Sequence, residues 1–154
     1  MIDALHGLHQ AFFGAVAAVG FGVLFNFGSR SLIWAAAAGA LALATRSVLQ
    51  SRGWTLEAST FVAALAAAFL AYGFLSRLGA AASAIALAGC IPMIPGAFFG
   101  NALLGFLAVT APAAQNADAT LVESLQAFLR VVFTLGAIGA GLTIPAHLIG
   151  HKGY

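Results

Sequence analysis

Long apolar stretches separated by short polar breaks make up the whole chain. Its charged residues leave uncharged runs of 26, 15, 19, 40 and 21 residues, at positions 4–29, 31–45, 58–76, 78–117 and 131–151. About 20 apolar residues form a helix that spans a bilayer, and these runs are apolar on every face, unlike the alternating strands of a membrane barrel. The pattern predicts an all-α fold: a polytopic membrane helix bundle of about five spans, forming a single transmembrane domain over residues 1–154.

Turn residues and charges mark the ends of the first three spans. Gly28 precedes Arg30, and Gly53 follows the second apolar run. Thr55 is placed to cap the third helix, which ends before Arg77. These positions predict spans over residues 8–27, 32–49 and 56–76.

The uncharged stretch of 40 residues contains Pro92, Pro95 and Gly96 near its middle. Proline interrupts a regular helix because it lacks an N–H and its ring clashes with the preceding turn. We therefore expect a fourth span over residues 80–110 that is broken at 92–96. Each half is too short to cross about 30 Å of hydrocarbon. Two geometries remain, one interrupted crossing or a re-entrant hairpin, and we favour the interrupted crossing.

A polar connection after position 110 leads into the last part of the chain. We expect a half-polar interfacial helix over residues 120–128 and a final span over 129–149. With five crossings, Arg30, Arg77 and Lys152 share one side of the membrane. The positive-inside rule then places the N-terminus outside and the C-terminus in the cytoplasm.

The composition excludes several classes of protein. Apolar residues make up 62% of the chain and charged residues only 6%, against about 25% in soluble domains, so a water-soluble monomer is excluded. The net charge of +2 comes from scattered Lys and Arg, without the basic patches that bind nucleic acid. No catalytic triad, zinc-protease or phosphate-loop pattern is present, so we do not expect an enzyme. The single Cys90 can form no internal disulfide.

Four histidines form two close pairs. His6 and His9 are three residues apart, and His147 and His151 are four apart, spacings that can place two ligands on one helical face. Five crossings put the pairs on opposite sides of the membrane, so we expect no metal site and no cofactor. The alternative function is a membrane anchor or scaffold that does not transport, and one form of this alternative binds haem.

Arg46 lies about one turn inside the end of the second span. A guanidinium in hydrocarbon costs at least about 2.5 kcal/mol, so this side chain needs compensation. Three arrangements are open: snorkelling toward the Arg52 side, pairing with Glu57 across the short turn, or binding an anionic substrate, which a planar fork of donors suits.

The Pro92–Gly96 break is the most specific local feature. Unwound backbone within a membrane is tolerated only where protein or water satisfies its polar groups. A helix that begins at Gly96 would offer free N–H groups and a positive dipole end to a carboxylate, as broken transporter helices do. Asn101 adds a polar side chain near that face. A simple packing kink is the other interpretation.

Several short blocks follow one another in an order and spacing that resembles the bacterial threonine/serine exporter family. The resemblance is narrowest to the small subunit of the split form, found in two-component succinate exporters. It covers nearly the whole chain, although beyond Thr110 it holds only in hydropathy. The blocks are Val19-Gly20-Phe21, Phe25-Asn26, Leu32 with Trp34, Arg46, Glu57-Ala58-Ser59-Thr60-Phe61 and Ile91-Pro92-Met93-Ile94-Pro95-Gly96.

This resemblance implies a multi-pass transporter of the bacterial inner membrane that exports small amino acids or dicarboxylates. It also implies a larger membrane subunit, made separately, that supplies the other half of the exporter. Abundant Gly and Ala on the helices favour close packing within the chain or against a partner, including a second copy. The substrate-binding or pathway positions implied by the resemblance or by the break are Asn26, Arg46, Glu57, Thr60, Pro92, Pro95, Gly96 and Asn101.

Overall fold

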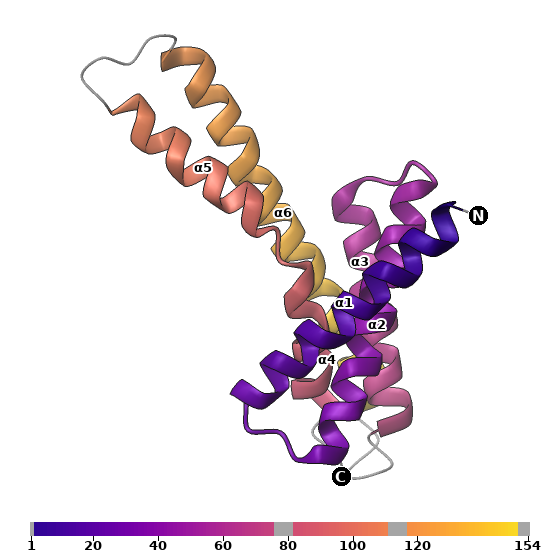
Figure 1. Ribbon diagram of the computed structural model, residues 1–154. Coiled ribbons are helices and arrows are strands. Elements are labelled where there is room, and N and C mark those ends of the chain that lie inside the picture. The colour runs from indigo at the N-terminus through magenta and orange to yellow at the C-terminus, as the bar shows by residue number, and fades with distance from the viewer. Residues whose placement is uncertain (1, 76–81, 111–116, 151–154) are drawn as a thin grey trace. The chain divides into compact units, whose positions relative to one another are not determined.

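All described secondary structure of the chain is helical. The structure is a computed structural model that describes residues 2–75, 82–110 and 117–150 (Figure 1). Arg77 and Lys152, on which the predicted membrane orientation depends, and His151 of the second histidine pair lie outside these residues. The elements are α1 (Ile2–Leu24), α2 (Ser29–Ser51), α3 (Leu56–Leu70) continued by the π-helical turn η1 (Ala71–Leu75), α4 (Ala82–Cys90) continued by the 3₁₀ turn η3 (Ile91–Met93), α5 (Gly96–Val109) and α6 (Ala117–Gly150).

The predicted bundle of membrane helices is confirmed. Four described helices are long and apolar enough to cross a bilayer, and α4 with α5 forms a bent pair that passes the same test as a fifth. The Pro-interrupted fourth helix is therefore present. A bent pair of this kind is either a broken span or a re-entrant loop, the two geometries that the sequence left open. The four spans are Leu5–Leu24, Ser29–Ser51, Leu56–Gly73 and Ala117–Ile149.

The last part of the chain is simpler than its polarity suggests. Residues 120–128 and 129–149, expected as an interfacial helix and a separate span, form one continuous helix α6. No glycine or proline occurs between Thr120 and Leu135, so nothing in the local sequence ends the helix there. At 34 residues, α6 is about 51 Å long, which exceeds the hydrocarbon thickness of about 30 Å.

The chain divides into two compact units. The first comprises Met1–Met93 with Ala137–Tyr154, and the second Ile94–Gly136. In the first unit α2 packs against α1, α3 and α4, around a core in which small residues predominate. That core contains Ala38, Ala42, Ala63, Ala64, Ala67, Ala68, Ala71, Ile85, Cys90 and Met93.

Glycines bring the helices of the first unit into backbone contact. A Cβ on Gly39 would overlap the carbonyl oxygen of Gly14 and lie 2.5 Å from the Cβ of Ala18, so α1 and α2 touch main chain to main chain. A Cβ on Gly141 of α6 would lie 2.7 Å from the Cβ of Ala64 on α3. These small residues thus serve packing within the chain, which replaces the hydrophobic drive that is absent in lipid.

In the second unit α5 runs beside the first half of α6 (Figure 1). Gly105 of α5 faces Ser124 of α6 at a contact that leaves no room for a Cβ. The rings of Phe106 and Phe128 meet edge-on with centroids 6.3 Å apart. These contacts hold the two helices together as a hairpin.

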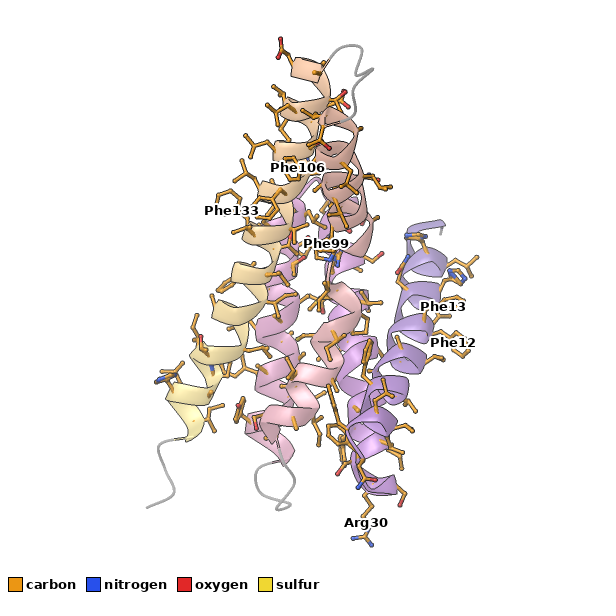
Figure 2. The ribbon with its side chains drawn as sticks, turned by 90° about the vertical axis from the view of Figure 1, so that its left-hand side faces the viewer. Phe12, Phe13, Arg30, Phe99, Phe106 and Phe133 are labelled. Carbon is orange, nitrogen blue, oxygen red and sulfur yellow. The ribbon has the colours of Figure 1, made fainter. Side chains whose placement is uncertain are left out.

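Large apolar side chains cover the outer surface. Phe12 and Phe13 of α1 point away from the neighbouring helices, whereas Arg30 extends from the first turn of α2 (Figure 2). A surface of this kind is stable in a lipid environment and unfavourable in water.

Candidate functional site

The helix break is built from two consecutive turns. After η3, Pro95 has φ −81° and ψ 67°, and the N–H of Gly96 donates to the carbonyl of Ile94 at 2.9 Å. These values describe an inverse γ-turn. The N–H of Phe99 then donates to the carbonyl of Pro95 at 3.1 Å and starts α5. The Gly96 amide is therefore used in the turn, and helix geometry leaves the amides of Ala97 and Phe98 as those without an intrahelical acceptor.

Arg46 is bound to the break itself. Its Nη1 donates to the main-chain carbonyl of Met93 at 2.8 Å, across 47 residues of sequence. Met93 is fully buried, and its carbonyl lies at the end of η3, where carbonyls lack helical partners. The arginine thus satisfies a main-chain acceptor that the break exposes, and the acceptor compensates a guanidinium that hydrocarbon disfavours.

The bond to Met93 was not among the three arrangements considered for Arg46 from sequence. No ion pair joins Arg46 and Glu57, both of which the structure describes, so that pairing is not formed. Glu57 instead lies in the first turn of α3, behind the Thr55 cap, which accepts from the N–H of Ala58 at 3.2 Å. A carboxylate there offsets the positive end of the helix dipole.

The Arg46–Met93 bond also locates the break along the bundle. Arg46 precedes the end of α2 at Ser51 by five residues, or about 8 Å of helix. The break, which this bond joins to Arg46, therefore lies toward this end of α2.

A cavity of about 200 Å³ lies beside this bond. It is below the range of about 300–1,000 Å³ that holds drug-sized ligands, so it suits a small solute. The start of α1, the end of α2 and η3 line it. Its lining consists of His6, Gln10, Leu43, Arg46, Ser47, Gln50 and Pro92.

The lining is polar and carries a positive charge. Among the described residues that form it, Arg46 holds the one permanent charge, and one of its five N–H donors is used by Met93. The amides of Gln10 and Gln50 and the hydroxyl of Ser47 add hydrogen-bonding groups. This combination is suited to a small solute with a carboxylate.

Sequence reasoning missed Gln10, Ser47 and Gln50 as members of this site. Ser47 and Gln50 follow Leu43 at helical spacing on one face of α2, and Gln10 lies one turn from His6 on α1. The spacing within each helix could have been read from the sequence. The packing of α1 on α2, which brings the two faces together, could not.

Asn26 has a structural place at the end of α1. Its φ is 57°, its N–H donates to the carbonyl of Val23, and the N–H of Phe27 donates to that of Gly22. This pattern is the Schellman helix end, with asparagine at the left-handed position where glycine is most common. Asn26 precedes the start of α2 at Ser29, which is about 26 Å of helix away from Arg46.

The remaining predicted positions are spread over both units. Thr60 is fully buried in α3, and its Oγ1 has no hydrogen-bond partner among the described residues. Asn101 is exposed on α5 and lines a different cavity in the second unit. The structure therefore brings Arg46 and Pro92 together at one cavity. It places Asn26, Glu57 and Thr60 elsewhere in the first unit, and Pro95, Gly96 and Asn101 in the second.

The described residues contain no group of three His, Cys, Asp or Glu side chains able to hold a metal ion. The sequence model of the family described as "Threonine/Serine exporter, ThrE" matches residues 10–148. The matched stretch includes Arg46, the helix break and the α5–α6 hairpin. No solved structure matches the chain.

Proposed function

Because the chain belongs to the threonine/serine exporter family, we propose that it is a subunit of a secondary transporter that exports small amino acids or carboxylates. The family is one of membrane exporters, which fits the apolar helices. The observation that carries the proposal is the bond from Arg46 to Met93 beside a small polar cavity. The guanidinium of Arg46 can bind a carboxylate, and it is held at a break where the helix can change its geometry.

The proposed mechanism couples solute binding to the break. A bidentate guanidinium–carboxylate pair is stronger than a single bond to a neutral carbonyl. A bound carboxylate therefore competes with the Met93 carbonyl for Arg46. Release of that carbonyl frees η3 to change its geometry, which is a way for an occupied cavity to open. Pro95 and Gly96 supply the turn at which the helix changes direction.

We also propose a larger membrane subunit as the partner, in the inner membrane, with the N-terminus outside and the C-terminus in the cytoplasm. The small-residue face of α5 supports a partner. A Cβ on Gly96 or Gly100 would meet no atom within 4 Å, so this face is open to another helix. A second copy of the chain is the alternative occupant.

Transport by purified protein in vesicles tests the proposed function. The chain is reconstituted alone and with the candidate larger subunit, and efflux of labelled serine, threonine and succinate is measured in parallel. We expect efflux of at least one of these solutes that requires both subunits. Efflux equal to that of protein-free vesicles in every combination would favour a scaffold, and efflux by the chain alone would contradict the need for a partner.

A further inference from the structure

The second unit contains its own charged cavity, which the Arg46 site does not use. It measures about 470 Å³ and lies between α5 and the first half of α6, the two helices that carry Phe106 and Phe133 in Figure 2. All residues that line it belong to the second unit. Its polar and aromatic members include Phe98, Asn101, Thr120, Glu123, Gln126 and Arg130.

Two opposite charges are spaced along one face of α6. Glu123 and Arg130 are seven residues apart, or about 10.5 Å along the helix, and both line the cavity. Side chains of a helix lean toward its N-terminus, so Glu123 and Arg130 lean the same way and their charged groups stay apart along the cavity. The described residues include no ion pair between them, so both charged groups remain free to bind a solute.

Arg130 is held in position by an aromatic ring. Its guanidinium carbon lies 5.3 Å from the centroid of Phe98, within the range of a cation–π contact. The guanidinium forms no hydrogen bond with another described residue, so its N–H groups can donate to an oxygen. Asn101, one turn along α5 from Phe98, offers a carbonyl and an amide in the same cavity.

We propose that this cavity binds a small zwitterion, an α-amino acid, with its carboxylate on Arg130 and its ammonium on Glu123. A dicarboxylate would place one of its charges against Glu123, and Arg130 is the one cation among the described residues that line the cavity. The inference rests on the proposed function in that the bound solute is the exported one. It extends that function by adding a second site and by favouring an amino acid over a dicarboxylate.

Equilibrium binding to the purified full-length chain tests the proposal, with L-serine, L-threonine and succinate as probes. We expect serine or threonine to bind more tightly than succinate. Glu123→Gln and Arg130→Gln should each weaken amino-acid binding roughly 10- to 150-fold, the effect of losing one charge-assisted hydrogen bond. Arg130→Lys should retain part of it. Asp118→Asn, which removes a charge of α6 outside the cavity, and Arg30→Gln on α2 are the matched controls and should change nothing.

A charge exchange separates ligand recognition from damage to the fold. Glu123→Arg supplies a second cation, so it should weaken serine binding and strengthen succinate binding. The proposal is overturned if Glu123→Gln leaves serine affinity unchanged, or if the wild-type chain prefers succinate. It is also overturned if the wild-type chain binds no amino acid and the Glu123 and Arg130 variants instead fail to assemble with a second protein chain. Binding without vesicle transport would contradict the proposed function alone, and transport with no binding at this cavity would contradict this inference alone.

Discussion

Arg46→Gln is expected to abolish export while the protein still inserts into the membrane. The change removes the permanent charge from the 200 Å³ cavity and the donor to the Met93 carbonyl. Loss of one charge-assisted hydrogen bond to a carboxylate corresponds to a roughly 10- to 150-fold weaker interaction. The unpaired Met93 carbonyl adds a further cost of about 1–3 kcal/mol to the closed break. Initial efflux rates in vesicles, normalised to the amount of assembled protein, measure the effect.

Two companion variants make the Arg46 result specific. Arg52→Gln removes a positive charge from the exposed end of the same helix, and it should export at the parental rate. Arg46→Lys keeps the charge but loses the planar fork that can serve a carbonyl and a carboxylate together, so its rate should be intermediate. Parental export by Arg46→Gln would show that the guanidinium has no part in transport.

Gly39→Ala is expected to cause the largest loss of stability in the bundle. The added Cβ would overlap the main-chain carbonyl of Gly14 and lie 2.5 Å from the Cβ of Ala18. Main chain cannot move aside as a flexible side chain can, so α1 and α2 must separate. Overpacking of a tight core typically costs about 1–3 kcal/mol. The fraction of monodisperse folded protein after heating in mild detergent reports the effect.

Gly20→Ala is the matched control for this substitution. Gly20 belongs to α1, one of the two helices in contact at Gly39, but a Cβ there would meet no atom within 4 Å. Because alanine has the higher helix propensity, Gly20→Ala should be neutral or slightly stabilising. If the two variants lost folded protein at the same temperature, the close approach of α1 and α2 would be refuted.

Hydropathy was sufficient to predict a bundle of apolar helices, and the prolines were sufficient to predict the position of the break. Charges in lipid cost so much free energy that membrane spans are visible in the sequence as uncharged runs. Unpaired main chain in lipid is also costly, so the helix-breaking Pro92 and Pro95 mark a specific feature. The same physics singled out Arg46. It could not predict that Arg46 binds Met93, because a contact across 47 residues depends on how α2 packs on α4.

Two local features were predictable in principle and were missed. The turn after α1 was attributed to Gly28, but Gly28 is extended, at φ −63° and ψ 156°, and Asn26 takes the left-handed position. Asparagine is the second choice for that position after glycine. The continuity of α6 follows from the lack of Gly or Pro between Thr120 and Leu135. Polar residues in that segment had suggested an interfacial helix, whereas α6 runs through it without a break.

Access of water to the Arg46 cavity is the central claim, and thiol labelling tests it most directly. Ser47→Cys places a thiol in the cavity lining, while the one native cysteine, Cys90, is buried, so the wild-type chain serves as the blank. Leu41→Cys, on an exposed apolar face of the same helix, is the lipid-facing control. A membrane-impermeant thiol reagent should label Ser47→Cys, and neither the wild-type chain nor Leu41→Cys, and serine or threonine should slow that labelling. A Ser47→Cys chain that stays as unreactive as the wild type would show a dry, closed kink and contradict the account.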